Sequence, residues 1–261
     1  MGKAGNYLRQ ILFNLLSFEN YLFVLSQLYF LFFNLGLLRK SRYYEYPYFL
    51  KKIVYRGDVV IDIGANLGYL TRLFSKLVKP EGKVYAVEPV QPILNVLRRN
   101  TKGLNNVEIY PFALGNENKP VSLGNETRVK RGYVASGSNF ILDREITGKK
   151  DADVEFEAEM RKGSELFANL NRLDFIKIDV EGYETVIIPE IESLIQQFKP
   201  LMLVETRNDN RRYLINYLAD RGYKPYELRN DLLHPADEHG HRDILFVSEE
   251  RTDRISKYLK D

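Results

Sequence analysis

One stretch decides the fold of this chain: Val59-Val60-Ile61-Asp62-Ile63-Gly64-Ala65-Asn66-Leu67-Gly68-Tyr69. Its run of branched apolar residues predicts a strand that is buried on both faces. An acid, Asp62, lies near the end of that strand, and two glycines four residues apart, Gly64 and Gly68, open an amphipathic helix. A strand, a glycine turn and a helix in this order are typical of a cofactor site in an α/β sheet.

A second strand of the same kind covers residues 84–88 and is followed by Pro89. It ends in Glu88, which lies about twenty residues after the first loop, where an acid binds both ribose hydroxyls of a nucleotide. The first loop is not Gly-x-Gly-x-x-Gly, and Asp62 stands where a pyrophosphate would bind. A carboxylate beside a helix N-terminus repels a second anion. The pattern therefore favours S-adenosylmethionine, which has a ribose, no phosphate and two cationic centres.

The residues expected to contact this cofactor come from the loops after the first three strands. A tight turn without a ligand is the structural alternative, because short motifs also occur by chance. The expected contacts are Asp62, Gly64, Ala65, Asn66, Gly68, Tyr69, Glu88, Pro89 and Ala113.

Four motifs together resemble one family. They are Asp62-Ile-Gly-Ala-Asn-Leu-Gly68, Val87-Glu88-Pro89, Ala113-Leu114-Gly115 and Ile178-Asp179-Val180-Glu181-Gly182-Tyr183-Glu184. Over roughly residues 43–248 the chain resembles the FkbM family of class I S-adenosylmethionine-dependent methyltransferases. The resemblance implies a Rossmann-like sheet of seven strands and methyl transfer to a hydroxyl, commonly on a sugar or a polyketide.

Hydrophobic periodicity predicts the same α/β architecture, a mostly parallel, doubly wound sheet. The last strand is expected to be antiparallel, because the polar stretch 229–242 leaves no room for a crossover helix. Strands are expected at 59–63, 83–88, 107–112, 174–179, 201–205, 224–228 and 243–248. Helices are expected at 43–55, 69–78, 93–102, 163–170, 185–197 and 210–221.

Length and composition predict one catalytic domain with appendages. The chain has 261 residues, no cysteine and a net charge of +3. The absence of cysteine excludes disulfides and thiol catalysis and fits a cytoplasmic protein. The balanced charge argues against a nucleic-acid partner. We expect a methyltransferase domain over residues 43–250, an apolar helical segment over 1–42 and a tail over 251–261. Residues 115–162 form an insertion with an exposed strand at 154–160, where substrate specificity is expected.

The N-terminal segment is rich in Leu, Phe and Tyr, and residues 20–38 contain no charge. Asn20, Gln27 and Asn34 recur every seven residues and form a polar stripe with Ser26. Three arrangements fit this pattern: packing on the catalytic domain or in a homodimer, a helix in the plane of the inner membrane face, or a membrane span. The basic residues that follow favour contact with anionic lipid, and they are Arg39, Lys40 and Arg42.

The fourth expected strand of the parallel sheet ends at a second acidic cluster, Asp179, Glu181 and Glu184. Methyl transfer from a sulfonium depends mainly on positioning the acceptor oxygen, and a base helps by accepting the hydroxyl proton. We expect Glu181 to bind or deprotonate the acceptor and Asp179 to orient the methionine end of the cofactor. The structural alternative is that Glu181 and Glu184 cap the following helix.

Three histidines lie close together, at His234, His239 and His241. Their spacing matches no recognised metal site, so no metal is expected and the loop is interpreted as solvated. His234 is nevertheless a candidate base, because imidazole titrates near neutral pH. Glu205 and Arg207 are alternative acceptor contacts.

The resulting hypothesis is an O-methyltransferase whose acceptor is a hydroxyl of a sugar, glycan or glycolipid. An NAD-dependent oxidoreductase or epimerase of a nucleotide sugar is the second hypothesis, and the absence of Gly-x-Gly-x-x-Gly argues against it. A non-catalytic scaffold at the membrane is the third.

Overall fold

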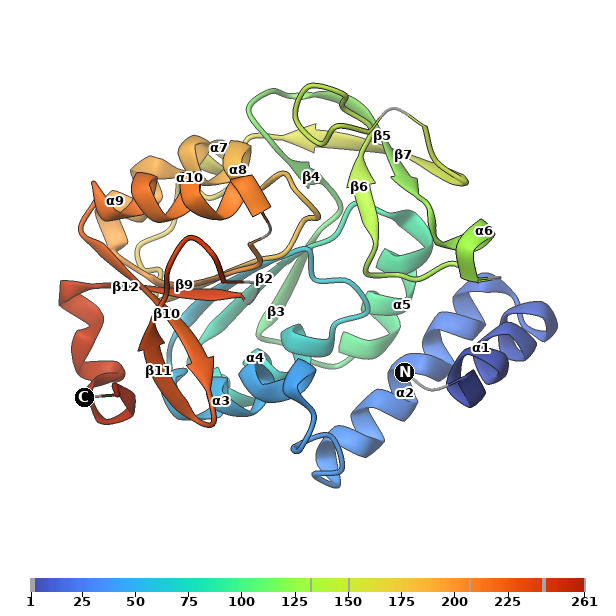
Figure 1. Ribbon diagram of the computed structural model, residues 1–261, viewed down its shortest axis with the longest axis horizontal. Helices are drawn as coiled ribbons and strands as arrows, with labels where there is room; N and C mark the ends of the chain where they lie inside the picture. Colours follow the sequence, from blue (N-terminus) through green and yellow to red (C-terminus); the bar gives the residue numbers. More distant parts are fainter. Residues whose placement is uncertain (1–2, 132, 150, 207, 241–242, 261) are drawn as a thin grey trace.

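A central sheet of eight strands organises the chain, in the order β11-β10-β12-β9-β8-β1-β2-β3 (Figure 1). The computed structural model describes residues 3–131, 133–149, 151–206, 208–240 and 243–260. Strands β3, β2, β1, β8 and β9 pair in parallel, and β12 lies antiparallel between β9 and β10, as predicted. The strands are β1 (Val59–Ile63), β2 (Lys83–Val87), β3 (Val107–Tyr110), β8 (Phe175–Ile178), β9 (Leu201–Val204), β10 (Tyr223–Arg229), β11 (Leu232–Pro235) and β12 (Ile244–Ser248).

The eighth strand, β11, corrects the expectation of seven. It pairs antiparallel with β10 inside the stretch 229–242 that was interpreted as a polar connection. Asn230 and Asp231 join the two strands with φ values of 52° and 65°. Two successive positive φ values are typical of the tight hairpin turn whose twist matches that of its strands.

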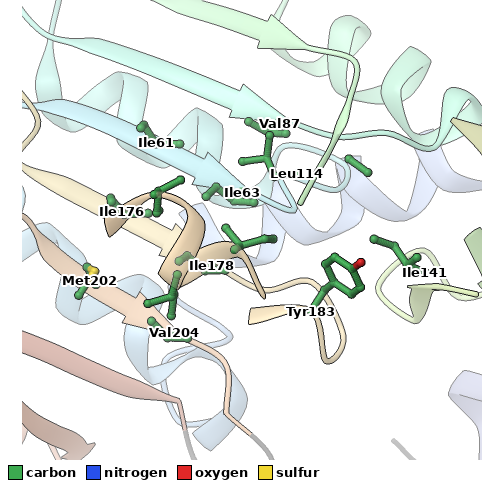
Figure 2. Close-up of a cluster of buried hydrophobic side chains, with 14 of the residues drawn as sticks. Ile61, Ile63, Val87, Leu114, Ile141, Ile176, Ile178, Tyr183, Met202 and Val204 are labelled. Atoms are coloured by element: carbon green, nitrogen blue, oxygen red, sulfur yellow. The ribbon is translucent and has the colours of Figure 1, made fainter. Parts of the chain in front are cut away.

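Helices cover both faces of the sheet because neighbouring residues of each strand point to opposite sides. Val60 belongs to one core cluster with residues of α3 (Glu45–Ile53) and α4 (Tyr69–Val78). Ile61 belongs to another with residues of α8 (Glu184–Glu190), α9 (Glu192–Phe198) and α10 (Asn208–Ala219). Figure 2 shows the side chains of this second cluster along β1, β8 and β9.

Shorter elements complete the domain. One helix was expected over 185–197, and it is divided into α8 and α9 at Ile191 after Pro189. At the C-terminal end Arg254 is buried and its guanidinium lies 2.6 Å from Asp58, so this part of the chain is fixed to the sheet. The remaining helical elements are η1 (Arg42–Tyr44), α5 (Gln91–Thr101), α7 (Gly163–Leu166), η2 (Glu249–Arg254) and η3 (Ser256–Tyr258).

The insertion builds a second sheet, in the order β4-β7-β5-β6. The exposed strand expected at 154–160 is β7, whose residues alternate between half-buried and exposed. Figure 1 shows this sheet above the carboxyl ends of the parallel strands, at the top of the view. Its elements are β4 (Ala113–Leu114), β5 (Lys119–Asn125), α6 (Thr127–Arg131), β6 (Asn139–Ile141) and β7 (Val154–Arg161).

The N-terminal segment forms α1 (Lys3–Leu15) and α2 (Phe18–Asn34), and α2 lies against α5 (Figure 1). The polar stripe of α2 faces this helix. The Gln27 amide donates to Asn100 Oδ1 at 2.8 Å, and the Asn100 amide donates to Ser26 Oγ at 2.9 Å. Arg99 donates to Asn20 Oδ1 at 3.2 Å. Asn20, Ser26 and Gln27 of the stripe therefore contact the domain, whereas Asn34 is exposed. Among the described residues no helix has the length and apolar character needed to cross a membrane.

Candidate active site

The turn between β1 and α4 is held tightly against β2 and β8. The N–H groups of Gly64 and Ala65 both donate to the Val87 carbonyl, at 3.0 and 2.9 Å. Gly64 has a φ of 73°, and a Cβ there would lie 2.0 Å from the Asp179 carbonyl oxygen. Only glycine fits such a conformation at such a close approach. The glycine at this position therefore brings the first loop and the Asp179 loop together.

Glu88 organises the other side of the same turn. One carboxylate oxygen accepts the N–H of Asn66 at 2.9 Å, and the other accepts the N–H of Val90 at 3.0 Å. Glu88 is 5% exposed, and its burial raises the pKa to about 7 against the opposing effect of these two hydrogen bonds. Each oxygen keeps a lone pair beyond its backbone partner.

A pocket that is partly open to solvent lies between the two loops and the insertion. Glu88 lies at one side, where it could accept hydrogen bonds from a ribose diol, and Asp179 would place a negative charge near the cationic end of S-adenosylmethionine. Apolar side chains that can contact an adenine ring include Phe112, Ala113, Leu114 and Ile141. The residues present therefore fit this cofactor.

Five of the nine expected cofactor contacts line this pocket: Gly64, Asn66, Glu88, Pro89 and Ala113. Ala65 and Gly68 support the loop from behind, since Ala65 is buried and a Cβ on Gly68 would lie 2.8 Å from Leu97. Tyr69 does not line the pocket, and it faces a second cleft that is described below.

Asp62 does not line the pocket either, because its carboxylate is fully buried behind the loop. The Thr71 hydroxyl donates to it at 2.6 Å, and Lys177 Nζ lies 3.7 Å from its other oxygen. Burial raises the pKa of Asp62, and Lys177 and Thr71 oppose this shift. Lys177 Nζ also donates to the Gly64 carbonyl at 2.7 Å. Asp62 and Lys177 thus fix the shape of the first loop from inside.

Lys177 is a buried cation at the centre of the acid cluster. Burial alone lowers its pKa, but the charges of Asp179, Asp62 and Glu205 outweigh burial and raise it. Its Nζ lies 3.5 Å from Asp179 Oδ2. A buried charge of this kind is stable only with such partners. The sequence interpretation missed this residue. A lysine inside the otherwise apolar strand Phe175–Ile178 was a signal that could have identified it.

The Asp179 loop presents the two candidate catalytic acids. Glu184 is buried, and its Oε1 accepts the N–H groups of Val180 and Gly182 at 3.2 and 3.3 Å. Glu184 therefore shapes the loop that precedes α8. Glu181 has a φ of 55° and lines the cofactor pocket. A left-handed conformation at a non-glycine residue costs of order 1–3 kcal/mol and is common at functional sites.

The insertion also contributes to the cofactor pocket, which the sequence interpretation missed. Ile141 of the insertion lines it together with Tyr183 of the Asp179 loop, and Figure 2 shows both beyond the ends of the strands. The insertion had been expected to set substrate specificity. Its pocket-lining residues are Leu123, Ser136, Gly137, Asn139 and Ile141.

A second, larger cleft, partly open to solvent, lies on the other side of the acid cluster. Its walls come from α1, α2, α3 and the start of α4, and its end beside β8 and β9 contains Lys177, Asp179, Glu205 and Asp243. Asp179 lines both cavities. We name this cavity the helical cleft.

The structure does not bring His234 to the acid cluster. It lies on the edge strand β11, with β10, β12 and β9 between it and β8. His239 has an exposed side chain, while His241 and Arg207 lie outside the described residues. Glu205, in contrast, follows β9 and lines the helical cleft beside Asp179.

Comparison with known proteins identifies the family. The model of the methyltransferase FkbM domain matches residues 62–225. Methyltransferase sdnD of Sordaria araneosa is 25% identical, in an alignment that covers 63% of this chain and 73% of sdnD. Methyltransferase 1 of Beauveria bassiana is 23% identical, in an alignment that covers 49% of this chain and 56% of that protein. The crystal structure of methyltransferase FkbM from Methylobacillus flagellatus KT is 16% identical, with a TM-score of 0.48, over 73% of this chain and 43% of its own.

The matched region contains the first loop, Glu88 and the Asp179 loop, which together form the cofactor pocket. The match argues against the oxidoreductase hypothesis, and the architecture is that of a class I methyltransferase. The chain belongs to the FkbM family of methyltransferases, and its cofactor is S-adenosylmethionine.

Proposed function

We propose that this protein transfers a methyl group to a hydroxyl oxygen of a sugar, glycan or glycolipid. The observation that carries the proposal is the position of Glu181, a carboxylate held on a strained loop at the edge of the cofactor pocket. A hydroxyl is a poor nucleophile until its proton is accepted, and a carboxylate within hydrogen-bonding reach performs that role.

Each acid has a separate part in this proposal. Asp179 orients the methionine end of the cofactor, and Glu181 accepts the hydroxyl proton of the acceptor. Bound S-adenosylmethionine supplies an electrophilic methyl group: the acceptor oxygen forms a bond to that carbon, the carbon–sulfur bond breaks, and its electron pair remains on sulfur. Positioning accounts for most of the expected acceleration, because the sulfonium is a good leaving group.

Glu181→Gln tests this assignment, because it keeps the size of the side chain and removes the proton acceptor. Label transfer from methyl-labelled S-adenosylmethionine into a glycolipid-containing cell extract should fall about 100-fold, with cofactor affinity by calorimetry within about threefold of wild type. The matched control is Glu155→Gln, an exposed glutamate on β7, which should keep full activity. Full activity in Glu181→Gln would show that another group accepts the hydroxyl proton, and Glu205 would be the next candidate.

We also propose that the N-terminal helices contact an anionic membrane surface at the cytoplasmic face. Among the described residues, nine of thirteen exposed large apolar or aromatic side chains lie between Tyr7 and Tyr43. An apolar patch flanked by exposed cations is typical of an interfacial membrane site. The cations are Arg39, Lys40 and Arg42.

Flotation with vesicles that contain phosphatidylserine tests the membrane contact. Arg39→Glu/Arg42→Glu should reduce binding at low salt by at least tenfold, because each basic residue contributes about 1 kcal/mol near anionic lipid. Lys102→Glu/Lys224→Glu makes the same charge change on exposed residues elsewhere and should leave binding nearly unchanged. If wild type stays unbound at low salt and sediments as a dimer, the exposed patch contacts a second copy and the membrane proposal is wrong.

A further inference from the structure

We infer that the helical cleft is the acceptor site and that it accepts an amphiphile. In this arrangement the head lies at the polar end of the cleft, beside Asp179 and Glu205, and its reacting hydroxyl extends past Asp179 toward Glu181 in the cofactor pocket, while an apolar chain lies along α2. The inference rests on the proposed hydroxyl methylation and adds the substrate class. It assigns the acceptor to a cavity built by the N-terminal helices, whereas the sequence interpretation expected the insertion to set specificity.

The position of the cleft relative to the cofactor pocket supports this assignment. Asp179 lines both cavities and lies at the end of β8. The acceptor must approach the transferred methyl group through space that the cofactor does not fill. The insertion lines the cofactor pocket, and the helical cleft meets that pocket at Asp179, on the side of the acid cluster that faces α2.

Apart from Arg9, the walls of the helical cleft are apolar and aromatic. Leu25, Leu28 and Phe32 line it from successive turns of α2, at spacings of three and four residues that lie on one helix face. Tyr29, from the same helix, lies with its ring 4.4 Å from that of Tyr69 and 5.6 Å from that of Tyr44. These walls suit the burial of an alkyl chain or a fused apolar ring system.

The end of the cleft beside β8 and β9 is polar. Asp179 and Glu205 follow adjacent strands β8 and β9, Asp243 precedes β12, and Lys177 lies among them. Carboxylates accept hydrogen bonds from hydroxyl groups, so this end suits a polyhydroxylated head rather than an anionic one. A cleft with one polar end and apolar walls is complementary to an amphiphile, which has a polar head and an apolar chain.

The mouth of the cleft opens onto the exposed apolar surface. Leu8, Phe32 and Tyr43 line the cleft and are nevertheless 52%, 40% and 92% exposed. An apolar chain can therefore pass from the surface patch into the cleft without crossing a polar rim at these residues. A soluble sugar without a chain gains nothing from such an entrance.

Leu28 allows a clean test, because it lines the cleft and does not belong to any of the hydrophobic core clusters of the described residues. Leu28→Asp places a charge on the apolar wall. Leu31→Asp is the matched control on the same helix, since Leu31 is 51% exposed and does not line the cleft. Each methylene that is buried should strengthen binding about fourfold.

The probes are n-octyl and methyl β-D-glucopyranoside, measured by equilibrium dialysis below the micelle concentration with S-adenosylhomocysteine present. Octyl glucoside should bind wild type at least tenfold more tightly than methyl glucoside, and Leu28→Asp should lose that preference. Leu31→Asp should keep it, and both variants should bind S-adenosylhomocysteine within about twofold of wild type.

Two results would overturn the inference. If Leu28→Asp and Leu31→Asp lose octyl glucoside binding equally, the octyl chain binds the surface patch and not the cleft. If wild type binds the two glucosides with equal affinity, the protein has no apolar site for the octyl chain. Neither result depends on turnover, so failure of the inference is distinguishable from failure of hydroxyl methylation, which the label-transfer assay measures.

Discussion

Glu88→Ala is the sharpest test of the cofactor site. Glu88 is proposed to accept hydrogen bonds from the ribose diol, and its two oxygens also accept the N–H groups of Asn66 and Val90. Truncation therefore removes the ribose contacts and also releases two backbone donors in the first loop. The experiment must separate these effects, because a distorted loop also weakens binding.

The expected loss follows from the strength of hydrogen bonds to a charged group. Two such bonds contribute roughly 1.5–3 kcal/mol each, and partial compensation by water leaves about 2–4 kcal/mol. This corresponds to about 30- to 700-fold weaker binding of S-adenosylmethionine. Glu88→Gln should also bind weakly, because an amide offers one acceptor oxygen and cannot serve both backbone N–H groups.

A chemical double-mutant cycle isolates the ribose contacts. Calorimetry with S-adenosylhomocysteine and its 2′,3′-dideoxy analogue, on wild type and Glu88→Ala, gives the coupling between Glu88 and the diol. We expect coupling of at least 1.5 kcal/mol. Glu108→Ala on β3 is the control, since Glu108 is half-exposed and pairs with Lys83, and it should leave the affinity unchanged. If removal of the diol costs the same in Glu88→Ala as in wild type, Glu88 does not bind the ribose.

Two further predictions concern the same loop. Gly64→Ala should destabilise the protein by roughly 2 kcal/mol or more and weaken cofactor binding at least tenfold, because the new Cβ meets the Asp179 carbonyl. The control is Gly148→Ala, which is also at positive φ but in open space, and it should lower the free energy of unfolding in urea by about 1 kcal/mol. Equal losses of stability in the two variants would contradict the steric argument. The raised pKa of Glu88 means that, between the ordinary value of 4.5 and about 7, the folded protein holds a proton that the unfolded chain has released. Stability of the cofactor-free protein should therefore fall as pH rises through this range, by roughly 3 kcal/mol at most. The fall should be smaller in Glu88→Gln, and parallel pH profiles for the two proteins would contradict the assignment.

The sheet could be predicted because its signals are local. Val59–Ile63 and Phe175–Ile178 are buried runs whose ends are marked by acids and glycines, and strand periodicity needs no distant partner. The position of Glu88 relative to Gly68 also follows from the standard length of a strand–helix–strand unit. Glu88 and Gly64 therefore lie where the sequence predicted, while Asp62 was correctly placed on its strand but was assigned a ligand contact that its burial prevents.

Other features depend on contacts between distant residues, which sequence periodicity does not reveal. The stripe of Asn20, Gln27 and Asn34 with Ser26 predicted that one side of this helix is wet or faces protein. The partner of Ser26 and Gln27, Asn100, lies more than seventy residues away in the sequence. His234 was a candidate base because imidazole titrates near neutral pH, whereas the Asn230-Asp231 turn folds it onto the sheet edge.

The separation of the two cavities has a consequence for specificity. The insertion lines the cofactor pocket, α1 and α2 line the helical cleft, and of the described residues that line either cavity, Asp179 alone is shared. The two appended parts also contact each other, since the Gln10 amide donates to the Arg131 carbonyl at 2.8 Å and the rings of Tyr21 and Tyr133 lie 6.4 Å apart. Substitutions away from these contacts should act independently, because residues without shared partners rarely couple. If the helical cleft is the acceptor site, the acceptor range can change through α2 while Glu88, Gly64 and the insertion remain fixed by the cofactor. The polar contacts of α2 with α5 give this arrangement a physical basis, since they hold α2 through one face and leave the face with Leu28 and Phe32 for the acceptor.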